Sequence, residues 1–114
     1  MPHYYAAKAA LSNSSVSLAR ELSNTGITVN TVSPGLIKTA EVEQSYQRRA
    51  QKKGWPTEGV SLEENIVQHD FPNPSGRLAT REDIADLVAF LASPRAGFIN
   101  GQNIRVDGGA VRYV

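Results

Sequence analysis

Two side chains near the start of the chain are suited to acid/base chemistry. Tyr4 and Lys8 are four residues apart, and on a helix this spacing places both side chains on one face. A free tyrosine has a pKa near ~10 and exchanges protons poorly at neutral pH. A cation held nearby stabilises the phenolate and lowers that pKa, so the pair can exchange a proton with an alcohol or a carbonyl. Taken alone, the spacing favours a simpler interpretation, in which an exposed lysine and a packed tyrosine merely share a helix face.

A long helix over residues 2–24 is predicted to carry this pair. Pro2 suits the first turn and Gly26 is the expected C-terminal stop. The segment is rich in alanine and serine, whose small side chains let another backbone approach closely. We therefore expect the helix to pack on a sheet and on a partner subunit. Its apolar stripe at helical spacing consists of Tyr4, Ala7, Leu11, Leu18 and Leu22.

Two strands and a further helix follow in an order that is typical of a parallel α/β sheet. Residues 27–32 are dominated by β-branched side chains and end at Ser33-Pro34-Gly35. A second strand is predicted over residues 102–106. Between them, residues 81–93 should form a helix, with Thr80 as N-cap and Asp83 completing a capping box. The buried stripe of this helix is predicted to be Ile84, Leu87, Val88 and Leu91.

Residues 36–75 contain too many glycines and prolines for regular structure throughout, and they predict a long excursion with short helical pieces. Residues 41–53 form its polar helix, and we interpret the basic run of Arg48, Arg49, Lys52 and Lys53 as a solvated helix face. Tyr46, Trp55 and Phe71 either line a substrate pocket or pin the excursion to the body of the protein. No acidic cluster accompanies His3 and His69, so no metal site is predicted.

Several segments together resemble the short-chain dehydrogenase/reductase family. Residues 4–11 are similar to the family's active-site helix, in which Tyr-x-x-x-Lys is followed by small residues. The matching order continues over nearly the whole chain, except for the variable stretch at about residues 42–74. The further segments that carry the resemblance are Leu18–Leu22, the strand that ends in Pro34-Gly35, Thr39, Gly76–Leu78 with Asp83–Ala85, and the final strand with Asp107-Gly108-Gly109.

This resemblance implies a role for each matching residue. Tyr4 would be the proton donor or acceptor to the substrate oxygen, and Lys8 would hold the nicotinamide ribose and lower the pKa of Tyr4. Pro34 and Gly35 would pass beside the nicotinamide of an NAD or NADP cofactor. Ile37 would offer backbone groups to its carboxamide, while Thr39 would reach the pyrophosphate. Residues 40–75 would be the substrate lid, and Asp107-Gly108-Gly109 would turn the chain near a subunit interface.

The implied fold class is α/β: residues 1–114 would be the C-terminal half of a Rossmann-like, doubly wound parallel sheet. The family's glycine-rich phosphate turn is not found in this sequence, and only three residues precede Tyr4, so the family's upstream serine is missing too. We therefore expect this chain to bind no dinucleotide and to be inactive alone. Two strands would leave open sheet edges, and leucines that would contact the missing half would be exposed. Pairing with another copy or with an upstream fragment is expected.

Composition narrows the remaining function classes. The 114 residues carry a formal net charge of +1, which gives no reason to propose nucleic acid or an anionic membrane as a partner. There are no cysteines, and no apolar run approaches the ~20 residues of a membrane span. A cytoplasmic oxidoreductase acting on a small carbonyl or alcohol substrate, as a homo-oligomer, is the leading hypothesis. The alternative is a non-catalytic truncated remnant that acts only as an oligomerisation module.

Overall fold

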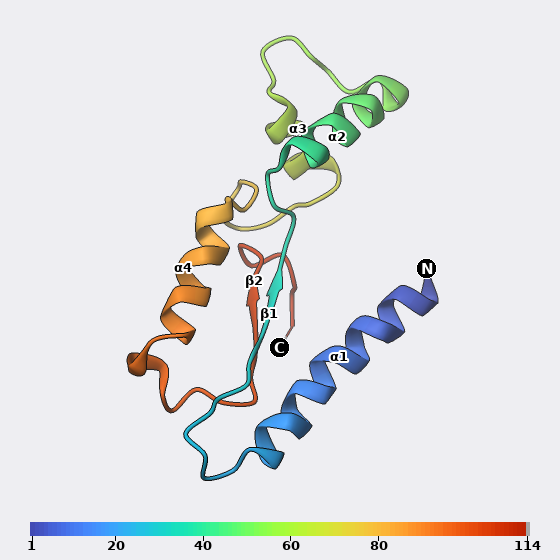
Figure 1. Cartoon of the computed structure of the whole chain (residues 1–114). Helices are drawn as coiled ribbons and strands as arrows, with labels where there is room; N and C mark the ends of the chain where they lie inside the picture. Colours follow the sequence, from blue (N-terminus) through green and yellow to red (C-terminus); the bar gives the residue numbers. More distant parts are fainter. Residues whose placement is uncertain (114) are drawn as a thin grey trace. The chain divides into compact units, whose positions relative to one another are not determined.

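The computed structural model describes residues 1–113, which contain several helices and one pair of strands (Figure 1). The backbone divides into two compact units, the first made of residues 1–33 and 86–105, the second of residues 34–85 and the segment that begins at Val106. Among the described helices, none is both long and apolar enough to cross a membrane. The elements in chain order are α1 (Pro2–Glu21), β1 (Thr31–Pro34), α2 (Ala40–Lys53), α3 (Leu62–His69), α4 (Arg81–Leu91), the 3-10 turn η1 (Pro94–Ala96) and β2 (Asn103–Val106).

The two strands pair in parallel, which confirms the predicted α/β class and the direction of the sheet. The Thr31 N–H donates to the Gln102 carbonyl at 2.8 Å, and the Gly35 N–H donates to the Val106 carbonyl at 2.9 Å. Both strands advance by the same four residues between these bonds, as parallel strands must. The second strand lies close to its predicted place, since β2 covers Asn103–Val106.

The first strand was predicted over residues 27–32, and this was wrong, because β1 covers Thr31–Pro34. Asparagine side chains replace part of the ladder before Thr31. The Val29 N–H donates to Asn100 Oδ1 at 2.8 Å, while Asn30 Nδ2 donates to the Ile99 carbonyl at 3.0 Å. These bonds satisfy backbone groups without a strand partner, so the extended segment joins the sheet later than its β-branched composition indicates.

Helix α1 turns a face of small residues toward its own unit. Residues 12, 15, 19 and 22 are the partly or fully buried positions of the helix and its C-cap, and their spacing follows one helical face. Ser15 on this face accepts a hydrogen bond from the Thr31 hydroxyl at 3.0 Å. Of the leucines in the predicted apolar stripe, Leu22 is partly buried, whereas Leu11 and Leu18 are 59% and 49% exposed. The helix ends at Glu21 rather than at residue 24, because Leu22 already caps it.

The second unit is built on a small core beneath α2 and α3, which pack on each other (Figure 1). Helix α2 confirms the predicted polar helix, and it stops at Gly54 in a left-handed conformation (φ 67°). Ser61 caps α3 by accepting a hydrogen bond from the Glu64 N–H at 3.1 Å. The buried centre consists of Ala50, Trp55, Ile66 and Leu78, with Leu36, Tyr46, Leu62, Val67 and Phe71 packed around it.

This core pins the excursion through the aromatic residues that the sequence singled out. Tyr46 and Phe71 pack against the core and Trp55 belongs to it, although Trp55 and Phe71 also line pockets. All four residues of the basic run are exposed, which confirms the predicted solvated face, and two of them also form ion pairs. Arg49 Nε lies 2.8 Å from Asp70 Oδ2, and Lys53 Nζ lies 3.8 Å from Asp70 Oδ1, so both hold the end of α3 against α2.

Helix α4 begins with the predicted capping box. The Asp83 N–H donates to the Thr80 hydroxyl at 3.1 Å, and the Thr80 N–H donates to Asp83 Oδ2 at 2.8 Å. The predicted stripe is confirmed in part: Ile84, Leu87 and Leu91 are partly buried, whereas Val88 is exposed and no residue of the helix is fully buried. The helix also ends at Leu91, two residues earlier than predicted, before η1 begins at Pro94.

Candidate functional site

Tyr4 and Lys8 are brought together by the first turns of α1. Lys8 Nζ lies 5.6 Å from the centroid of the Tyr4 ring, so the ammonium faces the ring. The Tyr5 ring meets Tyr4 edge-on, with centroids 5.6 Å apart. The Tyr4 side chain is 46% exposed, which leaves its phenol accessible to a reactant. The arrangement supplies a proton-exchanging group and a neighbouring cation on one exposed helix face.

Gly35 occupies a position where no side chain fits. An added Cβ would lie 2.7 Å from Phe71 Cζ and 3.0 Å from Asp107 Cα. Gly35 follows Pro34, the last residue of β1, and its N–H still bonds to Val106. The close approach of three chain segments therefore requires glycine here for steric reasons.

Ile37 lies on an isolated parallel bridge to Ala79. The bridge uses the neighbouring backbone groups: the Lys38 N–H donates to the Ala79 carbonyl at 2.8 Å, and the Ala79 N–H donates to the Leu36 carbonyl at 3.0 Å. In this pattern the N–H and C=O of Ile37 point to the opposite side of the segment. The N–H and C=O of Ile37 therefore point away from Ala79, and a group that carries an amide can form hydrogen bonds with them on that side.

Thr39 caps the N-terminus of α2, and an acid lies beside it. The Thr39 hydroxyl accepts a hydrogen bond from the Val42 N–H at 3.2 Å. Hydrogen bonds from its own backbone N–H and from the Thr39 hydroxyl, together with the charge of Arg81, hold the pKa of the Glu41 carboxyl below its usual value. The acids of this first turn stabilise the helix dipole. They also repel an anion that approaches Thr39.

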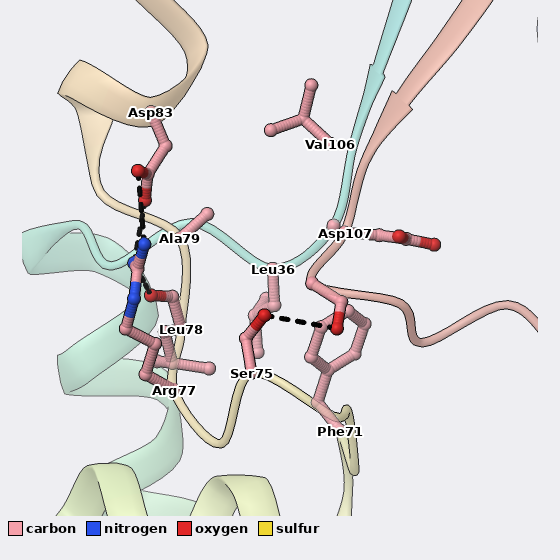
Figure 2. A pocket seen from close by; sticks show the side chains of 11 residues that line it. Leu36, Phe71, Ser75, Arg77, Leu78, Ala79, Asp83, Val106 and Asp107 are labelled. Atoms are coloured by element: carbon pink, nitrogen blue, oxygen red, sulfur yellow. Dashed lines mark hydrogen bonds and ion pairs between the residues drawn. The ribbon is translucent and has the colours of Figure 1, made fainter.

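A pocket of about 220 Å³ lies beside Gly35 within the second unit (Figure 2). One wall is the turn after β2, where Gly108 has φ +64° and an added Cβ would lie 2.6 Å from Asn73 Oδ1. The Ser75 hydroxyl donates to the Gly108 carbonyl at 3.2 Å. The lining residues are Gly35, Leu36, Phe71, Ser75, Arg77, Leu78, Ala79, Asp83, Val106, Asp107 and Gly108.

An ion pair closes another side of this pocket (Figure 2). Arg77 Nη1 and Nη2 donate to the two carboxylate oxygens of Asp83 at 2.7 Å and 3.1 Å. These bonds, with the Thr80 N–H, hold the pKa of the Asp83 carboxyl well below its usual range, and Asp83 raises the pKa of Arg77. The sequence marked both residues but not their pairing, and the contacts of Asn73 and Ser75 with Gly108 join distant segments that carry no local signal.

The predicted site residues fall into two groups. Tyr4 and Lys8 belong to the first unit, and Pro34, Gly35, Ile37 and Thr39 belong to the second. Within residues 1–113, no group of three or more histidine, aspartate, glutamate or cysteine side chains could hold a metal ion.

Comparison with known proteins adds a family match over almost the whole chain. Residues 1–111 match the family described as enoyl-(acyl carrier protein) reductase. The chain is 38% identical over 109 residues to 3-oxoacyl-[acyl-carrier-protein] reductase FabG of Vibrio cholerae, and 41% identical over 108 residues to the Escherichia coli protein of the same name. Each match covers 94% of this chain and 37% of the relative, so the chain spans little more than a third of these relatives.

Solved structures agree with this match. L-sorbose reductase from Gluconobacter frateurii, complexed with NADPH and L-sorbose, is 31% identical with a TM-score of 0.82, and the match covers 99% of this chain and 41% of that one. YwfH, an NADPH-dependent reductase involved in bacilysin biosynthesis, is 34% identical with a TM-score of 0.75, covering 93% of this chain and 38% of that one.

Proposed function

Because the chain belongs to the enoyl-(acyl carrier protein) reductase family, among the short-chain dehydrogenases/reductases, we propose that it forms part of an NAD(P)-dependent oxidoreductase. The reaction interconverts a carbonyl and an alcohol. The similarity to 3-oxoacyl-[acyl-carrier-protein] reductases and to an L-sorbose reductase supports this reaction class. The observation that carries the proposal is the Tyr4–Lys8 pair on an exposed face of α1 within the matched region.

Tyr4 exchanges the proton in this proposal. When a carbonyl is reduced, the substrate oxygen gains negative charge, and the Tyr4 O–H gives it a proton. In the reverse direction the Tyr4 phenolate accepts the proton of the alcohol. The Lys8 ammonium stabilises that phenolate and holds the ribose of the cofactor. The cofactor, when bound, supplies or accepts the hydride.

The second unit offers partial support for a cofactor site. Ile37 directs its peptide groups away from the bridge to Ala79, which suits the nicotinamide carboxamide. Gly35, next to Pro34, leaves the backbone without a side chain beside the ring. Thr39 suits the pyrophosphate less well, because its hydroxyl already accepts a bond from the Val42 N–H and the Glu41 carboxylate lies beside it. A bound pyrophosphate therefore requires that carboxylate to turn away.

We further propose that the chain corresponds to the C-terminal part of the family's domain, with residues 40–75 as the substrate lid. The order of the Tyr-x-x-x-Lys helix, the Pro34-Gly35 segment and Asp107-Gly108-Gly109 supports this placement. The glycine-rich turn and the serine would then lie in the part of the relatives that this chain does not span. The 114 residues alone would neither bind a dinucleotide nor turn over substrate.

The exposed side chains of α1 support an assembly with a second copy or with an upstream fragment. Tyr5, Leu11, Val16 and Leu18 are large hydrophobic residues on this helix that remain exposed in the single chain. Apolar surface of this kind is stabilised when another chain covers it. The same observation supports the alternative function, a non-catalytic module that only oligomerises.

Turnover separates these two functions. The longest reading frame that contains this sequence is purified, and consumption of NADPH and NADH is followed at 340 nm with a 3-oxoacyl thioester and with L-sorbose as carbonyl substrates. The enzyme hypothesis predicts turnover with at least one of these carbonyls, and the 114-residue chain in the same assay should give none. An in-frame stop codon just upstream of Met1 supports the oligomerisation module instead. A longer protein without activity on either substrate supports it as well.

A further inference from the structure

A separate pocket of about 530 Å³ lies in the α2–α3 region of the second unit. It shares no lining residue with the pocket at Gly35 and contains neither Tyr4 nor Lys8. Its volume falls within the range of pockets that bind small molecules, about 300–1,000 Å³. The lining residues are Gln47, Ala50, Gln51, Gly54, Trp55, Thr57, Val60, Leu62 and Asn65.

Asn65 contributes a buried amide to the lining of this pocket. The residue is only 2% exposed, and its Nδ2 donates to the Pro56 carbonyl at 2.7 Å. Because that carbonyl needs a donor, the amide cannot reverse its orientation without losing the bond. Asn65 Oδ1 is buried and receives no hydrogen bond from residues 1–113. A buried acceptor without a donor is rare and points to a missing partner.

The remaining wall of the pocket combines an apolar part with the uncharged polar side chains of Gln47, Gln51 and Thr57. Trp55 stacks with two other rings, and its centroid lies 5.0 Å from that of His69 and 6.4 Å from that of Tyr46. Ala50, Val60 and Leu62 complete the apolar lining. None of the nine lining residues is charged, so the pocket has no direct counter-ion for an ionic ligand.

We propose that this pocket binds a small neutral molecule with an apolar body and one O–H or N–H donor, and that the donor bonds to Asn65 Oδ1. The apolar body lies against Trp55 and the aliphatic wall. The pocket lies within residues 40–75, the proposed substrate lid, but the inference goes beyond the proposed oxidoreductase function because it uses neither Tyr4 nor a nicotinamide cofactor. The competing explanation is structural: Asn65 only fastens the loop at Pro56, and the pocket has no ligand preference.

Trp55 is the only tryptophan of the chain, so its fluorescence reports directly on the pocket. The full chain is titrated with cyclohexanol and, as a matched molecule without a donor, with cyclohexyl methyl ether. The proposal predicts a saturable change in emission with cyclohexanol and at least tenfold weaker binding of the ether. Equal affinities, or a non-saturable response to cyclohexanol, would overturn it.

Two variants and a control identify the acceptor. Asn65→Leu should weaken cyclohexanol binding at least tenfold, to the level of the ether, whereas Gln44→Leu on the exposed side of α2 should leave it unchanged. Ala50→Leu, which fills the pocket and retains Asn65, should abolish binding of both molecules. Circular dichroism checks that each variant is folded. If Asn65→Leu unfolds, the proposal is decided by the ratio of the affinities for cyclohexanol and the ether and by the binding of both molecules to Ala50→Leu. Unchanged cyclohexanol binding in a folded Asn65→Leu chain would refute the proposal.

Discussion

Replacing Gly35 with alanine tests how closely three chain segments approach one another at this residue. The added Cβ would lie 2.7 Å from Phe71 Cζ and 3.0 Å from Asp107 Cα, so the aromatic ring and a backbone segment must both move. Overpacking of this kind costs about 1–3 kcal/mol of unfolding free energy. For a domain of roughly this size, such a loss lowers the melting temperature by roughly 4–15 °C.

The assay is thermal unfolding followed by circular dichroism, with Gly97→Ala as the matched control. Gly97 has an ordinary φ of −62°, and its nearest contact is a milder 3.3 Å to the Pro94 carbonyl, so this change should shift the midpoint little. Because Phe71 also packs against the core, Gly35→Ala is made both in the parent and in a Phe71→Leu chain; it should cost less in the second, where the closest contact is gone. A Gly35→Ala chain that melts with the parent, or an equal cost in both backgrounds, would refute the steric argument.

Three further changes probe other parts of the structure. Asp83→Asn should lower the melting temperature at neutral pH. Because the pKa of Asp83 is depressed in the folded chain, the ionised carboxylate stabilises the fold fully above its unfolded pKa of about 3.9, and this stabilisation is lost as the pH falls below that value. The parent's acid-induced loss of melting temperature should therefore shrink in the variant, and identical pH profiles would contradict this. Ala19→Leu should destabilise by about 1–3 kcal/mol in urea unfolding, whereas Ala9→Leu on the exposed side should be nearly neutral; equal effects would refute the assigned face of α1. Glu41→Gln in the longer protein should tighten NADPH binding about two- to fivefold, as measured by calorimetry, and Glu43→Gln should tighten it less. Weaker NADPH binding in Glu41→Gln would show that this carboxylate does not oppose the phosphate.

Local signals predicted the parts of the fold that depend on neighbouring residues. The Thr80–Asp83 capping box spans one helical turn, so residue types and spacing were sufficient to predict it. The same holds for the polar helix before Gly54. The start of β1 was misplaced because Asn100, far along the chain, supplies the bond that a strand partner would give to Val29.

Burial and pockets were harder to predict, since they depend on which segments meet. Hydrophobic periodicity favours leucines as the packed face of α1, yet Ser15 and Ala19 form it, because small side chains allow a close approach. The requirement for glycine at residue 35 comes from Phe71 and Asp107. The unpaired acceptor of Asn65 likewise follows from its burial against a loop, and no sequence pattern indicates it.

The central claim is that Tyr4 exchanges the proton with the substrate, and one pair of variants tests it most directly. In the longer protein, Tyr4→Phe removes only a hydroxyl, while Tyr5→Phe removes the same group from the adjacent, exposed tyrosine. Loss of the acid/base group should lower kcat for carbonyl reduction by about 10²–10⁴-fold in Tyr4→Phe, and Tyr5→Phe should retain activity within about twofold. A Tyr4→Phe protein that turns over like the parent, or an equal loss in both variants, would contradict the claim.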